Sequence, residues 1–288
     1  MKNVPWWAKI LAKMILARLP LGYQMWQKLA LFRHGDMDQY SYVEKVFNFH
    51  VARCGLTDAL DGKVILELGP GDSVASAIFA ACHGAKCILI DVGPFAAQDV
   101  DVYHRLGTEL ENAGYLLPSS FGSAKSINDI LESCGAVYLT EGLSSFSQVE
   151  TGTVDMVFSQ AVLEHVRCEE FQRVANECYR VLQIDGLASH QIDLKDHLSN
   201  SLNNLRFSQK LWESEFFVNS GFYTNRIQYS AMLEMFLKAG FAVDSKDTKQ
   251  WATLPIARES MDIVFQNIPE DELNISEFDV LLSKKRME

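Results

Sequence analysis

Clustered cysteines and clustered basic residues are both missing from this sequence of 288 residues. None of its six cysteines forms a C-x-x-C pair, so neither a cysteine zinc site nor a dithiol redox motif is indicated, and a reducing, cytoplasmic setting is expected. The net charge at pH 7 is −11, and because phosphate binding requires basic clusters, nucleic acid is not expected as a partner. No Pro/Ser-rich linker or internal repeat divides the chain, so its length suits one large α/β domain with appended elements.

Acidic residues are missing from the first 35 residues, which carry six lysines and arginines and a net charge of +6. The rest of the chain carries 20 basic and 37 acidic side chains, a net charge of −17. A long hydrophobic run is missing as well, because Lys9 and Lys13 interrupt the apolar residues and Pro20 would end a helix. We therefore expect neither a membrane-spanning helix nor, without a small-residue cleavage site, a signal peptide.

The N-terminal segment is nevertheless amphipathic. As a helix, residues 4–19 would place Lys9 and Lys13 on one narrow stripe, with tryptophan and aliphatic side chains on much of the rest. One interpretation is a peripheral membrane contact through residues 1–20, with Trp at headgroup level and Lys toward anionic lipid. The other is an apolar face that covers the domain or the partner in a homodimer.

The clearest pattern in the chain lies in residues 63–92. A short run of Val, Ile and Leu at 64–68, typical of a strand buried on both faces, leads into a turn that contains Gly69 and Gly71. An Ala-rich helix over 74–83 and a second apolar strand follow. The two glycines let the backbone turn tightly and approach a ligand closely. This βαβ layout is that of a nucleotide site, with the ligand at the helix N-terminus.

The chemistry of the turn argues against a dinucleotide. A dinucleotide fingerprint requires a third glycine, but Val74 occupies that position. Glu67, two residues before the first glycine, would repel a pyrophosphate and attract a cationic ligand. S-adenosylmethionine carries an amino group and a sulfonium, so it fits this charge better than NAD does. Asp91 ends the second strand, 24 residues after Glu67, where it is placed to accept hydrogen bonds from ribose hydroxyls.

At these residues the sequence resembles the class I S-adenosylmethionine-dependent methyltransferases, whose first motif is acid-x-Gly-x-Gly. The fourth strand of that family and the Leu-Glu-His-Val turn after it are matched by Asp155 and residues 163–166, and the next helix and turn by 177–186. The resemblance covers about residues 64–192 in order. It implies a Rossmann-like, doubly wound α/β fold with a seven-stranded, mostly parallel sheet, whose antiparallel last strand, at 277–283, is inserted next to the sixth.

The same resemblance indicates the domain organisation. A helix predicted over about 40–54 leads toward the first strand, so we assign residues 1–55 to a helical N-terminal segment and 56–288 to the methyltransferase domain. Two long connections, at about 94–135 and 198–229, are substrate-side insertions in this assignment.

The resemblance also implies that S-adenosylmethionine is the cofactor and which residues bind it. Glu141, at the tip of the third strand, is the candidate for the adenine amino group, and Ser159 and Gln160 fall where the methionine end is lined. The complete expected set is Glu67, Gly69, Pro70, Gly71, Asp91, Glu141, Ser159 and Gln160. Some ubiquinone-pathway O-methyltransferases bind a metal through the Glu-His pair and an acid four residues before the His. Ala161 occupies that earlier position here, so no metal is predicted.

Methyl transfer to a hydroxyl needs a base, because an alcohol is a poor nucleophile until it loses its proton. His165, in the Leu-Glu-His-Val turn, is the first candidate, ahead of His190 and Asp193 in the fifth strand. His197 follows in the same neighbourhood. A structural role for His165 at the start of a helix stays open.

Residues 198–229 combine aromatic side chains with Asn and Arg donors, a mix that suits a polar ring-shaped or anionic ligand. Arg206, Tyr223 and Arg226 are predicted to bind it. We expect O-methylation of a small-molecule or glycan-type acceptor. Three alternatives stay open: a cap that only buries its aromatic residues, a non-catalytic scaffold that binds the cofactor, and a nucleotide-dependent oxidoreductase.

Overall fold

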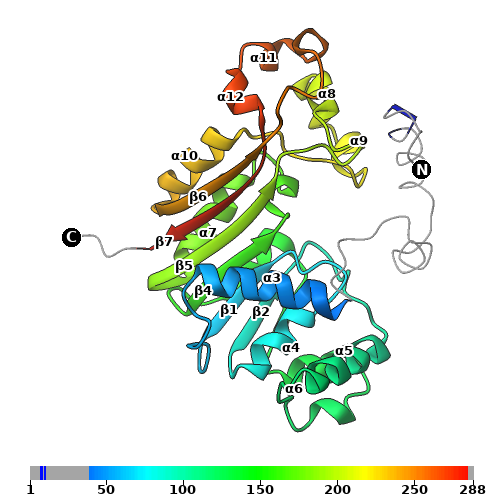
Figure 1. The fold of residues 1–288 in the computed structure, drawn as a ribbon, viewed down its shortest axis with the longest axis vertical. Helices are drawn as coiled ribbons and strands as arrows, with labels where there is room; N and C mark the ends of the chain where they lie inside the picture. The colour runs from blue at the N-terminus through cyan, green and yellow to red at the C-terminus, as the bar shows by residue number, and fades with distance from the viewer. Residues whose placement is uncertain (1–6, 9, 11–38, 285–288) are drawn as a thin grey trace.

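A seven-stranded sheet forms the centre of the protein in this computed structural model, which describes residues 7, 8, 10 and 39–284 (Figure 1). The strands are β1 (Val64–Leu68), β2 (Lys86–Ile90), β3 (Val137–Leu139), β4 (Val154–Gln160), β5 (Leu182–Asp193), β6 (Ala242–Gln250) and β7 (Ile275–Ser283). Their order is β3-β2-β1-β4-β5-β7-β6. Strands β1 to β5 run parallel, and β7 lies antiparallel between β5 and β6. The predicted α/β class, seven strands and antiparallel last strand are confirmed.

Helices cover both faces of the sheet. The longer ones are α3 (Tyr40–Arg53), α4 (Ala75–Cys82), α5 (Val100–Asn112), α6 (Ile127–Ser133), α7 (Phe171–Val181) and α10 (Tyr229–Ala239). Shorter helices lie in the connections: α8 (Gln209–Trp212), α9 (Glu215–Val218), α11 (Ile263–Gln266) and α12 (Glu270–Leu273). Five 3-10 turns complete the described elements: η1 (Phe121–Ser123), η2 (Gly142–Gln148), η3 (Leu163–His165), η4 (Asn203–Arg206) and η5 (Arg258–Ser260).

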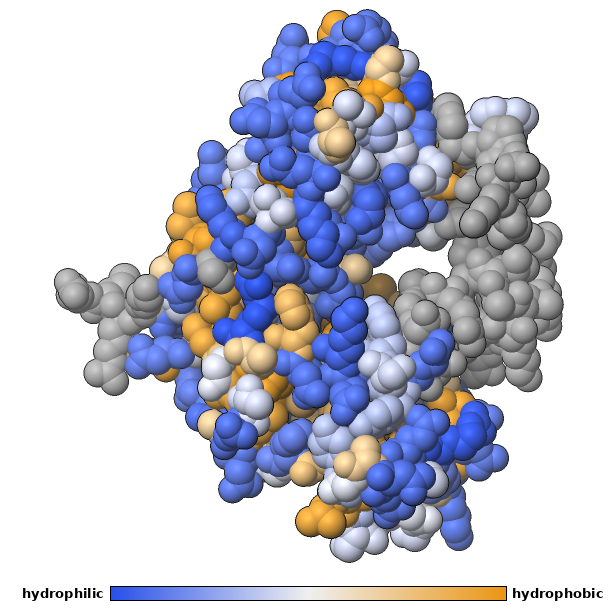
Figure 2. All heavy atoms as spheres, in the orientation of Figure 1, coloured by the Kyte–Doolittle hydropathy of each residue, from blue (hydrophilic) through white to orange (hydrophobic). Residues whose placement is uncertain are grey.

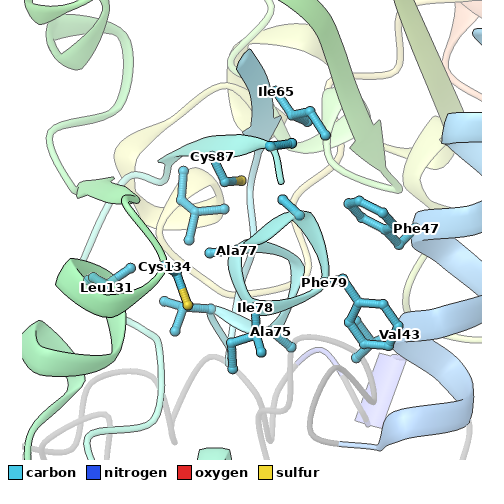
Figure 3. Packing of buried hydrophobic residues seen from close by; sticks show 14 of the residues in the cluster. Val43, Phe47, Ile65, Ala75, Ala77, Ile78, Phe79, Cys87, Leu131 and Cys134 are labelled. Atoms are coloured by element: carbon cyan, nitrogen blue, oxygen red, sulfur yellow. The ribbon is translucent and has the colours of Figure 1, made fainter. Parts of the chain in front are cut away.

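One face of the sheet is covered by α3, α4 and α6, with α4 in the middle (Figure 3). Phe79 of α4 is fully buried, and its ring centroid lies 5.7 Å from that of Phe47 on α3. Cys134, at the end of α6, packs into the same core. Helix α3 therefore shares its core with the glycine-rich βαβ unit, although it precedes the predicted domain start.

The opposite face is covered by α7 and α10. Because successive strand residues point to opposite faces, Ile65 of β1 belongs to the core under α4, whereas Leu66 and Leu68 belong to the core with α7. This two-sided burial explains why β1 is apolar at almost every position. Its one charged residue, Glu67, points to the same side as Ile65.

Local signals in the sequence set two of the helix ends. The side chain of Ser126 caps α6 by accepting a hydrogen bond from the N–H of Asp129 at 3.2 Å. Gly240 ends α10 with a left-handed φ of 105°, and a Cβ there would lie 2.8 Å from the ring of Tyr179.

Strand β5 starts earlier than the sequence predicts. A turn at Asp185-Gly186 is expected before a strand from residue 187, yet β5 begins at Leu182, directly after α7. Asp185 takes a left-handed φ of 66° inside the strand, and its N–H donates to the carbonyl of Lys284 at 2.8 Å. The left-handed residue bends the strand without ending it, because the chain after β7 supplies the missing hydrogen-bond partner.

Residues 194–228 and 251–274 together form a cap that follows the end of β5 (Figure 1). One of its apolar clusters is mostly aromatic and contains Ile10, Leu198, Trp212, Phe217, Phe222 and Tyr223. The other joins the two parts of the cap through Leu202, Leu205, Met261, Phe265 and Leu273. Figure 2 shows that hydrophilic residues predominate on the visible face of the molecule, with apolar residues interspersed.

The N-terminal segment touches the cap at one described residue. Ile10 is 6% exposed within the aromatic cluster, whereas Trp7 is 54% exposed. At Ile10 the apolar face therefore covers protein. Most of the predicted membrane or dimer contact through residues 1–20 lies outside the described residues. Within the described part of the chain, no helix has the length and apolar composition that a membrane span requires.

Candidate functional site

The turn after β1 adopts a conformation that glycine favours. Gly69 and Gly71 have φ values of 65° and 63°, and Pro70 between them is buried. The N–H of Gly69 donates to the carbonyl of Ile90, at the end of β2, at 2.8 Å. A Cβ on Gly69 would lie 2.6 Å from the methyl groups of Val162, so the turn after β4 packs directly against this glycine loop.

The side chain of Asp91 shapes the same loop. Its carboxylate accepts hydrogen bonds from the N–H groups of Gly71, at 3.0 Å, and of Val92, at 2.7 Å. Its carbonyl accepts from the N–H of Gly142 at 2.8 Å, which places the exposed Glu141, just after β3, beside it. A carboxylate oxygen has two lone pairs. Lone pairs thus remain on the carboxylate of Asp91 for a ribose hydroxyl. The contact of Asp91 with ribose and that of Glu141 with adenine both remain predictions.

Glu67, two residues before the loop, is 2% exposed. Burial raises the pKa of its carboxyl to about 8, and the negative charge of Asp91 acts in the same direction. Its Oε2 is buried and has no hydrogen-bond partner among the residues described. A cationic ligand near this carboxyl would favour its charged form, so Glu67 fits a ligand that carries ammonium and sulfonium groups.

The side chains of Ser159 and Gln160 are engaged inside the protein. The hydroxyl of Ser159, fully buried, lies 2.8 Å from Nδ1 of His190. Oε1 of Gln160 lies 3.1 Å from Nε2 of His50 on α3, whose Nδ1 lies 2.8 Å from the hydroxyl of Ser189. This buried polar network crosses from β4 to β5. The contacts of Ser159 and Gln160 with the cofactor remain predictions.

Burial distinguishes the predicted bases. His190 is 1% exposed, its ring stacks on Phe236 of α10 at 5.8 Å, and burial lowers its pKa to about 3. In this position its ring contacts the core rather than the ligand edge where the sequence places it. Asp193 is half-buried and forms an ion pair with Lys195 at 3.3 Å, and burial raises its pKa. Of the three candidates, His165 alone is exposed.

The turn between β4 and α7 is held from the cap. Ala161 has a left-handed φ of 53°, which is unfavourable for alanine and requires support from its surroundings. Asn225 provides that support across the turn. Its Nδ2 donates to the carbonyls of Leu163, at 2.8 Å, and Val166, at 2.9 Å, and its backbone N–H donates to the carbonyl of Glu164 at 2.7 Å. The turn and the cap are therefore one hydrogen-bonded unit.

His165 lies at the end of this turn. Its Nδ1 is 2.7 Å from the carbonyl oxygen of Tyr223. Because a carbonyl oxygen can only accept, Nδ1 carries the proton, and the lone pair of the neutral imidazole is on Nε2. Nε2 can therefore accept a proton from a hydroxyl or bind a metal ion.

Glu164 and His197 lie next to His165. One donor atom of each residue lies within 4.8 Å of the others, and the two imidazole rings are 4.7 Å apart between centroids. Glu164 is 1% exposed, and burial raises its pKa well above the usual range. The three side chains form the one group of metal-ligand type within the described residues, so they could hold a metal ion.

Asp196 orders the loop that carries His197. Its carboxylate, 1% exposed, accepts hydrogen bonds from the N–H groups of Leu198, at 3.0 Å, Ser199, at 2.7 Å, and Asn203, at 2.6 Å. A buried carboxylate with several backbone donors fixes the loop in one geometry. Asp196 thus fixes the backbone of the loop that carries His197.

Arg226, predicted to bind the acceptor, supports the cap from inside. It is 7% exposed and has a left-handed φ of 60°. Its guanidinium donates to the carbonyl of Phe207 at 2.6 Å and lies 5.3 Å and 5.0 Å from the ring centroids of Trp212 and Phe265. These contacts commit the charge of Arg226 to the cap rather than to an exposed binding site.

The other two predicted acceptor residues also make internal contacts. Tyr223 is 4% exposed, and its hydroxyl donates to Oε2 of Glu213 at 2.8 Å. Arg206 is half-buried, and its Nε donates to Oδ1 of Asn203 at 2.9 Å. Tyr223 acts on the site through its backbone, because its carbonyl orients His165.

Sequence reasoning missed two residues that shape the site, Asn225 and Asp196. Asp196 has a local signal, since its carboxylate accepts from N–H groups two and three residues ahead, as in an Asx turn. Asn225 has none, because its partners in the turn after β4 are about 60 residues away in sequence.

Comparison with known proteins identifies a methyltransferase domain within the chain. Residues 123–189, which include β4, the turn with His165 and most of β5, match a family model described as a methyltransferase domain. The fold is similar to that of phosphoethanolamine N-methyltransferase 2 from Haemonchus contortus, with a TM-score of 0.50 and 10% identity over 92% of this chain and 60% of that chain. The match over residues 123–189 and the similar fold both support the predicted class I S-adenosylmethionine-dependent methyltransferase family.

Two further solved structures have lower TM-scores to this protein. An S-adenosylmethionine-dependent methyltransferase from Mesorhizobium loti has a TM-score of 0.44 and 13% identity, covering 83% of this chain and 99% of its own. One from Methanosarcina mazei has a TM-score of 0.45 and 16% identity, covering 79% and 94%. A search of curated proteins finds no match.

The residues of the candidate site fit S-adenosylmethionine, the cofactor that the family resemblance implies. The glycine loop leaves no room for a Cβ at Gly69, and Glu67 offers a buried carboxyl oxygen without a partner among the described residues. The glycine loop, Asp91 and Glu67 would hold the cofactor. When bound, it supplies a methyl group on a sulfonium centre that is open to in-line displacement.

Proposed function

We propose that this methyltransferase methylates a hydroxyl oxygen of a small-molecule or glycan-type acceptor. The observation that carries the proposal is the tautomer of His165, which presents the lone pair of Nε2 at an exposed position. Val162, three residues earlier, packs against the glycine loop, so the turn that carries His165 adjoins the predicted cofactor site. A hydroxyl needs such a group because it is protonated and a poor nucleophile at neutral pH.

A polar groove next to the same turn supports a polar acceptor. Its volume is about 440 Å³, and it is lined by Arg167, Cys168, Glu169, Gln209, Glu213, Glu215 and Val218. Arg167 and Glu215 form an ion pair at 2.9 Å in this lining. Charged and amide side chains of both donor and acceptor type suit a hydroxyl-rich ligand, and the volume is in the range of small-molecule sites.

The residues of the site have separate tasks in the proposed reaction. Asn225 and the carbonyl of Tyr223 orient the imidazole of His165. Nε2 of His165 would take the hydroxyl proton, while the methyl group would pass from the sulfonium of the cofactor to the acceptor oxygen and leave a neutral thioether. The cap and the turn after β4 keep the acceptor aligned, and alignment is the main requirement of an in-line displacement.

The test is His165→Ala in the full-length protein. Transfer of methyl label from S-adenosylmethionine into the small molecules and glycans of a cell extract should fall at least about 100-fold, because a positioned base contributes roughly 10²- to 10⁴-fold. The cofactor dissociation constant, measured by calorimetry, should not change. His104→Ala, on α5, is the control that should keep both properties.

Three results would contradict the proposal. Full turnover in the His165→Ala protein would show that the acceptor needs no base at this position. Label found on nitrogen rather than oxygen, by mass spectrometry of the products, would replace the hydroxyl with an amine acceptor. Equal loss of turnover and cofactor affinity would assign His165 to the shape of the cofactor pocket.

A further inference from the structure

We propose that Glu164, His165 and His197 bind a divalent first-row transition-metal ion such as Zn²⁺. One donor atom of each lies within 4.8 Å of the other two, and the imidazole rings are 4.7 Å apart. Ligands at about 2.0–2.2 Å from a tetrahedral zinc ion are roughly 3–4 Å from one another, so only small side-chain shifts are needed to close the set.

The carboxyl of Glu164 is the first independent observation. It is 1% exposed, and neither oxygen has a hydrogen-bond partner among the residues described. The backbone amides of Glu164 and Asp193 are near enough to favour its charged form, but neither reaches hydrogen-bond geometry. A buried carboxyl left in this state is costly. A cation held by its oxygens would compensate for that cost.

A small cavity beside Glu164 does not remove the need for a cation. Its volume is about 20 Å³, which is room for one water molecule, and its lining includes Asp193, Asn204 and Arg226. One water would satisfy one carboxyl oxygen of Glu164. The second oxygen would still lack a partner within the described part of the chain.

The orientation of His165 is the second independent observation. Its Nδ1–H donates to the carbonyl of Tyr223, which places the lone pair on Nε2. Histidines that bind metals commonly donate their other N–H to a carbonyl or carboxylate in this way, which fixes the ring and its tautomer. Metal binding therefore needs no rearrangement of this hydrogen bond.

The backbone that carries the three ligands is fixed before any metal binds. Asn225 holds the turn with Glu164 and His165, and Asp196 holds the loop with His197. Both supports are buried and make several hydrogen bonds to backbone groups. Binding sites with prearranged ligands lose little conformational entropy when the ion enters.

The donor set selects the class of ion. Two imidazoles and one carboxylate suit Zn²⁺, Fe²⁺ and Co²⁺ rather than Mg²⁺ or Ca²⁺, which prefer all-oxygen ligands. Three protein ligands leave at least one position for water or an acceptor oxygen, and His165 is exposed toward solvent. The sequence predicted no metal because Ala161 lacks a donor, whereas folding brings His197 from a loop 32 residues beyond His165.

The role of the ion in the reaction rests on the proposed function, whereas the binding of the ion to the protein does not. A divalent cation lowers the pKa of a hydroxyl bound to it, so the proton can leave to solvent water before the oxygen takes the methyl group. In that case Nε2 of His165 acts as a ligand and solvent accepts the proton. Removal of the metal distinguishes the role of His165 as a base from its role as a metal ligand.

The binding test uses the full-length protein, freed of metal with a chelator and dialysed. Titration with Co²⁺ should give visible absorption bands that saturate at one equivalent, and Zn²⁺ should displace them. Glu164→Gln, which is close to isosteric, and His197→Ala should each weaken Zn²⁺ binding at least 100-fold by calorimetry. His104→Ala should bind like the unchanged protein. Circular dichroism verifies that each variant is folded.

The outcomes separate the two proposals. The metal site is overturned if the unchanged protein binds no stoichiometric Zn²⁺ or Co²⁺, or if both ligand variants keep its affinity. In that case loss of turnover in His165→Ala still supports a base. If the metal binds but the chelated protein keeps full turnover, the site stands and the role of the ion in activating the hydroxyl is overturned. Turnover lost on chelation and restored by Zn²⁺ supports both the metal site and the role of the ion in activating the hydroxyl.

Discussion

The cofactor half of the site, in residues 64–92, and the acceptor half, made of the turn after β4 and the cap, are held by contacts of different reach. In the cofactor half, the carboxylate of Asp91 binds the N–H of Gly71, 20 residues away. In the acceptor half, Nδ1 of His165 is bonded to the carbonyl of residue 223, 58 residues away. The first half is one βαβ unit, whereas the second exists only when two distant segments meet.

The two halves also differ in what they bury. The strands of the cofactor half bury mostly aliphatic side chains, whereas the acceptor half buries Asp196, Asn225 and Arg226, each hydrogen-bonded to backbone groups. Buried polar groups hold a loop in one geometry, because each unpaired group would cost about 1–3 kcal/mol. Each half keeps one buried carboxyl, Glu67 or Glu164, with an oxygen that has no partner among the described residues. In both places we expect a cation.

We expect the largest effect from acid, which should destabilise the buried polar network of His50, Ser159, Gln160, Ser189 and His190. In an unfolded chain histidines titrate near pH 6.5, whereas burial lowers the pKa of His50 to about 4 and of His190 to about 3. Between these values the unfolded state binds more protons, so stability is present above pH 6.5 and is lost as pH falls. Each histidine should remove about 1.4 kcal/mol of unfolding free energy per pH unit in this range.

Denaturant unfolding at pH 7 and at pH 5 measures this loss, with other titrating groups included. His190→Asn retains a polar partner for Ser159 but cannot titrate, so its stability should depend less steeply on pH over the same range. The same slope in both proteins would mean that His190 is not the group that resists protonation.

Removal of Asn225 should break the acceptor half alone. Asn225→Ala leaves the buried carbonyls of Leu163 and Val166 without their donor, so the free energy of unfolding should fall by about 2–4 kcal/mol. Turnover should fall as well, because His165 loses its support, while calorimetry should show little change in cofactor affinity. Asn219→Ala, an exposed asparagine of the same cap, should change stability by less than about 0.5 kcal/mol. Equal effects of the two substitutions would contradict the role of Asn225.

The smallest effect is expected for changes in the cofactor half, and it should appear in cofactor binding. Gly71→Val introduces a branched side chain at a left-handed φ, and Asp91→Ala removes the acceptor of two backbone N–H groups and the predicted ribose contact. Each should weaken cofactor binding by about 1–3 kcal/mol, measured by calorimetry. Gly122→Ala is the control, since a Cβ there meets open space. Unchanged affinity in both variants would contradict the assignment of this loop.

Much of the cofactor half could be predicted from sequence because its signals are local. The apolar run at 64–68, the two glycines and the acid at the end of β2 are close enough in sequence to specify one another. The same holds for the Ser126 cap and for Gly240 at the end of α10. The family motif then implied the strand order, which periodicity alone does not contain.

The side chains of the site show where sequence reasoning ends. It placed His190 and Ser159 at the ligand edge, but the register of β4 against β5 directs them to each other inside the core. It assigned Arg226 to the acceptor, but the rings of Trp212 and Phe265 enclose its guanidinium. In each case the deciding partner lies on another element.

The sequence by itself determined the βαβ unit and the position of the glycine loop, because hydrophobic periodicity and glycine chemistry act between near neighbours. The doubly wound topology and the cofactor followed from the family resemblance of its motifs. Only the tertiary structure decided the tautomer of His165 and the meeting of Glu164 with His197. A proton is placed on Nδ1 by a carbonyl 58 residues away, and the third residue of the proposed metal site, His197, comes from a loop held by Asp196. Such choices depend on which hydrogen bonds are completed in the folded chain, and no local pattern encodes them.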